Sequence, residues 1–269
     1  MRHAGRLSAC LRRGARFVGR VVARTTEISG YDRALALAAQ AFVALVPLLL
    51  VVAAAAPDAA RQAVATWLFE NPDPGGDAAA VLDPLLQPPP VDTEQVTVLG
   101  SALLIMSVTG FTRTLQRTFV AAWDMPRPGL FGFGWGVLGA AVLVAGVVML
   151  VLVAPLMQAL PNPPLLTAGV RLAPSVGLWW VVQWLLLGGA VGWRPLLPGA
   201  AVTGLGQVVV MAVSGLYLPQ VIGRQAERFG AIGAAFVVVS WLVVLGMLLV
   251  VAAVAGAELM RGRTPPAPR

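Results

Sequence analysis

Six long apolar runs recur along this chain, and the stretches between them hold most of its charged residues and prolines. An apolar helix of roughly 20 residues is long enough to cross the hydrocarbon core of a bilayer. The runs therefore predict six transmembrane helices, at residues 34–56, 96–119, 131–157, 174–193, 198–218 and 229–258. The fold class that follows is an all-α integral membrane protein in which residues 34–259 form one six-helix membrane domain.

Residues 1–33 form a basic leader with apolar positions at helical spacing. The apolar positions are Leu7, Leu11, Val18, Val21, Val22 and Ile28, and the arginines around them are Arg6, Arg12, Arg13, Arg16, Arg20 and Arg24. Such a pattern is typical of an amphipathic helix that lies in the membrane interface, with its cations among the phosphates. We predict this arrangement on the cytoplasmic side; a disordered basic tail is the alternative. The leader lacks the continuous apolar core of a signal peptide, so we expect no cleavage.

Two further segments are polar. Residues 57–95 carry seven acidic residues against one arginine: Asp58, Glu70, Asp73, Asp77, Asp83, Asp92 and Glu94 against Arg61. Prolines recur through the same stretch, and the run at residues 88–90 opposes a continuous helix. We therefore predict an extramembrane acidic loop at 57–95. Residues 260–269 are basic and rich in proline, which predicts a disordered tail.

The distribution of arginine predicts the orientation of the chain. All 19 basic residues are arginine. If the amino terminus is cytoplasmic and the spans number six, only Arg61, Arg171, Arg224 and Arg228 fall outside. Basic residues are favoured on the cytoplasmic side of membrane helices. The count of six spans thus agrees with both termini inside and with the acidic loop at 57–95 outside.

Composition and charge exclude several classes of protein. The chain is 58% hydrophobic and 12% charged, which is too apolar for a soluble domain of 269 residues. The net charge of +7 comes from arginines beside apolar segments rather than from a basic patch interleaved with aromatics, so we expect anionic lipid head groups as partners and no nucleic acid.

The sequence offers little for catalysis. One cysteine, Cys10, and one histidine, His3, cannot form a His/Cys metal site. The phosphate-binding loop of ATPases and the Gly-x-Ser-x-Gly motif of hydrolases do not occur. We therefore expect no cofactor, no metal and no enzymatic activity. The predicted spans also lack a charged residue near their centres, which disfavours a proton-driven mechanism.

The polar residues left within the spans are neutral. Gln40, Gln183 and Gln207, together with Tyr217, could converge on a polar cavity between helices. The alternative, which we favour, is that the glutamine amides only hydrogen-bond neighbouring helices and hold the bundle together. Pro47 interrupts the first span and is a candidate hinge, although a static kink is more common.

A carboxylate marks the cytoplasmic end of the last span. Glu258 lies near Arg261, and the plainest interpretation is a carboxylate at the interface paired with an arginine. A stronger hypothesis is a salt bridge from Glu258 to Arg113, Arg117 or Arg194. That salt bridge would tie spans two, four and six together at the inner face.

Several motifs in order resemble the YihY/BrkB family of bacterial inner-membrane proteins. The motifs are Ala38-Ala39-Gln40-Ala41-Phe42 with Pro47; Leu115-Gln116-Arg117, Trp123-Asp124 and Arg127-Pro128; Arg194, Leu197-Pro198-Gly199-Ala200 and Tyr217; and Phe229-Gly230-Ala231-Ile232-Gly233, Trp241 and Gly256-Ala257-Glu258. The resemblance covers residues 31–260. The chain departs from the family pattern at Val43, where a second aromatic is frequent, and at Phe229, where a tyrosine often stands.

The resemblance implies a six-span protein of the cytoplasmic (inner) membrane with a role in envelope integrity. Its function would be the translocation of a lipid or another amphiphile through a groove between helices. The alternative is a non-transporting membrane scaffold that organises envelope proteins. Members have also been described as ribonuclease BN-like, but the carboxylates of this chain lie mostly in the outer loop, away from cytoplasmic RNA, so we expect no nuclease activity.

Overall fold

The computed structural model describes residues 2–55, 93–126, 134–146, 149 and 164–261. Within these ranges the chain is helical and contains no strand. The helices are α1 (Arg2–Glu27), α2 (Gly30–Ala55), α5 (Thr93–Ala122), α7 (Pro164–Leu186) and α8 (Trp193–Arg261), with a further helix at residues 134–146. The predicted all-α class is therefore confirmed for the described residues. Three predicted segments lie largely outside the described residues. They are the loop at 57–95, of which only the last three residues are described, much of the span at 131–157, and the tail from residue 262.

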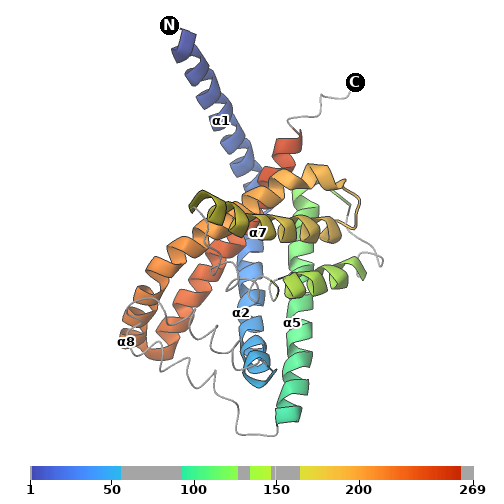
Figure 1. Cartoon of the computed structure of the whole chain (residues 1–269), viewed down its shortest axis with the longest axis vertical. Coiled ribbons are helices and arrows are strands. Elements are labelled where there is room, and N and C mark those ends of the chain that lie inside the picture. The colour runs from blue at the N-terminus through green and yellow to red at the C-terminus, as the bar shows by residue number, and fades with distance from the viewer. Residues whose placement is uncertain (1, 56–92, 127–133, 147–148, 150–163, 262–269) are drawn as a thin grey trace.

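Several helices run lengthwise, and α7 lies across them (Figure 1). α2 and α5 contact each other and run along the long axis of the molecule, and α8 folds back on itself beside them. The amino-terminal end of α1 and the carboxyl-terminal end of α8 lie toward the same end of the molecule. An even number of membrane crossings requires the two ends to lie on the same side. The count of six crossings and the cytoplasmic location of the ends stay predictions.

The break within α8 differs from the predicted one. We expected the fifth span to begin after Pro198 and end at residue 218, but the helix begins at Trp193 and stays helical past Pro219. It breaks at Gly230, whose φ of 60° and ψ of −149° suit only glycine. We call residues 193–229 the first limb of α8 and residues 231–261 the second limb. Membrane helices tolerate a proline, which explains why Pro219 does not end the first limb.

The fourth predicted span is also displaced. We predicted residues 174–193, whereas α7 begins at Pro164, keeps Pro174 inside, and ends at Leu186. Gly188 and Gly189 follow with φ of 63° and 71°, a left-handed conformation that ends helices. A proline is favoured in the first turn of a helix, and Pro164 rather than Pro174 occupies that position.

The basic leader is helical, as predicted. α1 ends at Glu27, and Ser29, with φ of 53°, separates it from α2. Among the side chains described from residue 12 onward, burial begins near the carboxyl-terminal end of α1: Val21 is 7% exposed, whereas Val18 is 58% exposed. Figure 1 shows the rest of α1 projecting away from the other helices. Its predicted location in the membrane interface stays a prediction.

The hydrophobic core lies near the end of the molecule where α1 meets the bundle. Its largest buried apolar side chains come from four helices and are Leu37, Leu115, Phe119, Val182, Leu186, Leu196, Val250 and Val254. Among the described residues, two helical segments are long and apolar enough to cross a membrane, Trp193–Leu218 and Ile232–Arg261, one in each limb of α8. The membrane-spanning parts of α8 are thus the best supported.

Candidate functional site

An apolar groove opens between the two limbs of α8. Its volume is about 770 Å³, within the range of small-molecule binding sites, which is roughly 300–1,000 Å³. The first limb contributes Val209, Val210, Val213, Ser214, Tyr217, Leu218, Val221 and Gln225, and the second contributes Phe229, Ile232, Gly233, Phe236, Val237, Ser240, Trp241 and Val244. None of these lining side chains is charged. The groove is therefore suited to a hydrocarbon chain.

The groove lies between the places where the two limbs are held close together. Near the ends of α8, Gly199 and Gly256 bring the two backbones together: a methyl group added to Gly256 would lie 2.7 Å from the Cα of Gly199. Toward Gly230 the facing residues are large and exposed; Phe236, for example, is 74% exposed. The limbs are also close beside Gly230, where a methyl group added to Gly233 would meet the Gln225 carbonyl, so the groove lies between two close contacts and is lined by bulky side chains.

The two serines and the tryptophan indole of the groove make hydrogen bonds within the protein. The Trp241 indole donates a hydrogen bond to the Ser214 hydroxyl, and this bond joins the two limbs. Ser214 and Ser240 each donate to the backbone carbonyl four residues earlier, at 2.7 and 2.8 Å. The groove thus presents mainly apolar surface. Tyr217, one of the predicted polar-cavity residues, lies here and is 62% exposed.

The three glutamines predicted for a polar cavity lie elsewhere, at two helix interfaces. Gln207 joins α8 to α7, where its carbonyl accepts hydrogen bonds from Trp179 at 2.6 Å and Ser175 at 3.3 Å. Gln183 lies in the same interface, is 1% exposed, and donates to the Thr203 hydroxyl at 3.4 Å. These geometries match the alternative in which glutamine amides join neighbouring helices.

Gln40 belongs to the interface between α2 and α5. Its amide oxygen lies against Gly110, where an added methyl group would be 2.7 Å from it. The structure therefore brings Gln183 and Gln207 to one interface and places Gln40 at another. Neither set lines the groove. Pro47, the candidate hinge, is buried within an unbroken α2.

Removing the Gln207 amide tests its role in packing. We expect Gln207→Leu to lower the free energy of unfolding by about 0.6–2 kcal/mol, because the Trp179 indole, 6% exposed, would lose its acceptor. Thermal unfolding in detergent, followed by tryptophan fluorescence, measures the effect. Gln220→Leu on the exposed side of the same helix is the control and should leave stability within about 0.5 kcal/mol. A silent Gln207→Leu would contradict this role.

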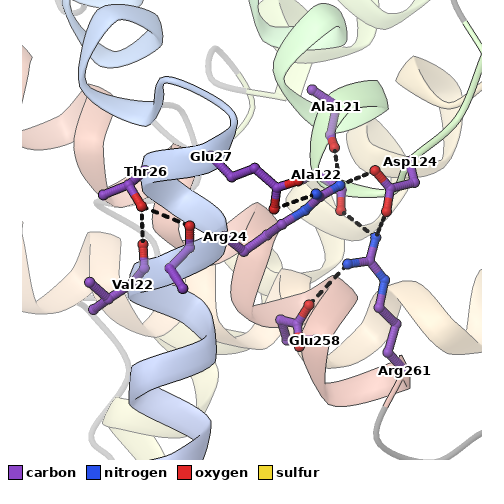
Figure 2. A network of polar contacts seen from close by, with 10 residues as sticks. Val22, Arg24, Thr26, Glu27, Ala121, Ala122, Asp124, Glu258 and Arg261 are labelled. Carbon is purple, nitrogen blue, oxygen red and sulfur yellow. Dashed lines mark hydrogen bonds and ion pairs between the residues drawn. The ribbon is translucent and has the colours of Figure 1, made fainter.

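A network of ion pairs joins three helices at the end of the molecule opposite Gly230 (Figure 2). Arg24 of α1 pairs with Glu27 at 2.8 Å and with Asp124, just after α5. Asp124 also accepts a hydrogen bond from Arg261 of α8 at 2.5 Å, and Arg261 pairs with Glu258 at 3.0 Å. One carboxylate thus bridges the ends of α1 and α8.

The end of α5 explains why Asp124 can make this bridge. Asp124 has a φ of 53°, and the Met125 amide donates to the Val120 carbonyl at 3.0 Å, which is a Schellman ending. Two guanidinium groups complete the cap: Arg24 donates to the Ala121 carbonyl at 3.4 Å and Arg261 to the Ala122 carbonyl at 3.3 Å. Cations are favourable at the negative end of a helix dipole.

A third arginine, in α2, contacts the turn after α1 and the end of α5. Arg33 donates to the Ile28 carbonyl at 2.7 Å and to the Arg117 carbonyl at 3.1 Å. Burial lowers the pKa of the Arg33 guanidinium, because desolvation disfavours the charged form, although arginine stays protonated at neutral pH. Arg33 precedes the predicted first span and so belongs to the same polar end of the molecule.

The partners of Glu258 differ from the stronger hypothesis. Its carboxylate, 10% exposed, is paired with Arg261 at 3.0 Å and with Arg20 at 3.4 Å. We had expected Arg113, Arg117 or Arg194, but Arg194 lies over the Trp193 ring instead, 5.5 Å from its centre. The physical reason is that α1 packs beside the end of α8 and brings its own arginines to the carboxylate. The plainer interpretation, a pair with Arg261, is confirmed.

Sequence reasoning missed the importance of Asp124, although a signal was present. The Trp123-Asp124 turn was visible as the exit from the second span, and aspartate tolerates a left-handed conformation better than most residues. Its partners could not be read from the sequence, because Arg24 lies 100 positions before it and Arg261 lies 137 positions after it.

Comparison with known proteins identifies the family. A family model described as Virulence factor BrkB matches residues 21–269, which covers all of the described helices except most of α1. No curated protein and no solved structure matches the chain. The match agrees with the motifs from Ala38 to Glu258 and with the apolar limbs of α8. The chain therefore belongs to the BrkB family and is a membrane protein of that family.

Proposed function

We propose that this chain is a non-enzymatic protein of the bacterial inner membrane that maintains the envelope by moving an amphiphile between the two leaflets. The observation that carries the proposal is the uncharged groove between the limbs of α8, about 770 Å³ in volume. The hydrocarbon part of the amphiphile would lie between the limbs. Its polar head would stay outside the groove, where water or lipid head groups solvate it.

The chemistry of the groove supports a hydrocarbon ligand. Exposed aromatic and aliphatic side chains such as Phe236 and Val213 line it, and its two serine hydroxyls are already hydrogen-bonded within the protein. A ligand with many polar groups would lose hydrogen bonds to water on entering and gain few in return. An acyl or prenyl chain has no such cost.

The proposed topology follows from the arginines and the common end of the chain. Six spans with both termini in the cytoplasm place the ion-pair network at the inner face and Gly230 at the outer face. The leader supports this orientation, because its exposed arginines, such as Arg12 and Arg16, would face anionic head groups of the inner leaflet. The groove, whose lining residues flank Gly230, then lies in the outer half of the membrane.

Filling the groove tests the proposal. We expect Val213→Trp to reduce the transfer of a fluorescent phospholipid between the leaflets of reconstituted vesicles by about tenfold or more, because the indole would occupy the space of the chain. Leu216→Trp is the matched control: it adds the same ring to the same limb, at a residue that is 78% exposed and does not line the groove. The control should transfer lipid at the parent rate.

The outcome also separates transport from scaffolding. If the parent protein neither moves nor retains lipid, the translocator proposal fails. A scaffold would then be supported if deletion of residues 70–92 abolished envelope function in cells while the purified variant unfolded at the parent temperature. Envelope proteins that bind the outer loop would be the partners in that case.

A further inference from the structure

Two arginines lie on the groove-facing side of the first limb, among the last residues of that limb that line the groove. Val221 and Gln225 line the groove, and Arg228 follows Val221 by seven residues, about two helical turns, so that it lies on the same side of the helix. Arg224 stands one turn before Arg228. Both arginines are exposed, and the Arg224 Nε donates to the Gln220 carbonyl at 3.1 Å. The end of the groove near Gly230 therefore carries cationic side chains.

The charge near the Gly230 end of the groove differs from that of the residues that line the groove. The lining residues are neutral, whereas the turn of helix that leads to Gly230 holds Arg224 and Arg228 with one exposed carboxylate, Glu227. Glu227 comes one residue before Arg228, about 100° away from it around the helix, and one turn after Arg224, so that the two arginines and one carboxylate leave a net positive charge here. The side of the helix that faces the groove is thus apolar along its length and basic at its end.

Arg224 and Arg228 are also exceptions to the predicted enrichment of arginine on the cytoplasmic side. In the topology proposed above, they lie at the outer face, where basic residues are disfavoured beside membrane helices. Packing does not require them, because both are exposed. A ligand that needs positive charge at this end of the groove accounts for their position, and guanidinium groups bind phosphate oxygens through paired hydrogen bonds.

We infer that the groove of α8 binds an amphiphile with a phosphate head, whose hydrocarbon chain lies between the limbs while Arg224 and Arg228 bind the phosphate. The inference rests on the proposed function, because it names the class of ligand for the same groove. Binding requires both parts of the ligand. The hydrocarbon chain makes the apolar contacts, and the phosphate head lets the two arginines distinguish anionic lipids from neutral or zwitterionic ones.

Lipid selection by purified protein tests the inference. The parent chain is purified in detergent with equal amounts of phosphatidylglycerol and phosphatidylcholine, and the retained lipid is measured by mass spectrometry. We expect the parent to prefer phosphatidylglycerol, and we expect Arg224→Gln with Arg228→Gln to lower that preference about tenfold, while phosphatidylcholine is still retained. Arg228→Glu should lower it further, because a carboxylate repels the phosphate.

The control is a pair of substitutions with the same charge change elsewhere. Arg12→Gln with Arg16→Gln removes two exposed arginines with the same spacing from α1 and should leave the preference in the groove unchanged. Glycerol phosphate, which has the head but no chain, should not displace the lipid at millimolar concentration. Displacement by glycerol phosphate would overturn the requirement for the chain and with it the inference.

The failure of this inference differs from failure of the proposed function. If the double arginine variant keeps the parent's preference for phosphatidylglycerol, Arg224 and Arg228 do not bind the head, although the groove still binds lipid. If the parent retains neither lipid and Val213→Trp leaves lipid transfer unchanged, the groove is not a lipid site, and both this inference and the proposed function are wrong. Circular dichroism of each variant establishes that it is folded before the lipids are compared.

Discussion

Replacing Gly256 with alanine is expected to destabilise the protein by about 1–3 kcal/mol, the usual cost of overpacking a tight contact. The added methyl group would lie 2.7 Å from the Cα and 3.2 Å from the backbone nitrogen of Gly199. Those atoms belong to the backbone of the other limb of α8, so no side chain can rotate to make room. The limbs would have to separate where they now touch.

A second glycine of α8 provides the matched control. A methyl group added to Gly215 meets no atom within 4 Å, so Gly215→Ala should be neutral or stabilising by up to about 1 kcal/mol, because alanine favours helix. Thermal unfolding of both variants in the same detergent measures the difference. Equal unfolding temperatures for Gly256→Ala and Gly215→Ala would show that the limbs are not in close contact at Gly256.

The same substitution has a consequence for the groove. Because the limbs are joined at Gly230 and touch again at Gly199 and Gly256, separating them at the second contact alters the distance between them along the groove near Phe236. Gly256→Ala should therefore change lipid retention as well as stability, whereas Gln207→Leu should change stability alone. Measuring both properties in both variants separates the packing of the bundle from the shape of the groove.

The long apolar runs were enough to predict the all-helical fold and the positions of several helices. The spans predicted at 34–56 and 96–119 correspond to α2 and α5, and the start of the last span at Phe229 is one residue from the break at Gly230. Apolar runs are long-range averages, which local turn signals do not disturb. The ends were less accurate, because Pro174 and Pro219 suggested boundaries that α7 and α8 do not obey.

The candidate site was less predictable than the fold, for a physical reason. A sequence shows which residues are polar within a span, and this drew attention to Gln40, Gln183 and Gln207. A groove, however, is defined by where two helices separate, and the separation depends on the contact between Gly199 and Gly256 and on the break at Gly230. The residues that line it are ordinary apolar side chains, which carry no distinguishing pattern.

Replacing Asp124 with alanine is expected to let α1 pivot and to lower the free energy of unfolding by about 1–3 kcal/mol. The Arg24 side chain is only 14% exposed and would lose the carboxylate that bridges it to Arg261. Asp124 is itself 60% exposed, so solvent screening keeps the cost near the lower end of that range. Glu27→Ala, at a carboxylate 66% exposed, is the control and should cost less than about 0.5 kcal/mol.

Spin labels would detect the pivot of α1 directly. In a Cys10→Ser background, labels at Arg16→Cys on α1 and Leu197→Cys on α8 occupy exposed positions. We expect a narrow distribution of distances in the otherwise unchanged protein and a broader one after Asp124→Ala. High salt should broaden the parent distribution in the same direction, because 1 M salt screens charges beyond about 3 Å. No broadening in either condition would contradict a role for the ion pairs in holding α1.

The apolar contacts of α1 decide between pivoting and release. Val21 and Ile28 are 7% and 9% exposed, and burying a side chain of this size contributes about 1.5–3 kcal/mol. These two contacts remain in Asp124→Ala, so the carboxyl-terminal turn of α1 should stay on the bundle while its direction is lost. Adding Val21→Ala to Asp124→Ala should then release the helix, since both the polar and the apolar contacts would be weakened at the point where α1 meets α8.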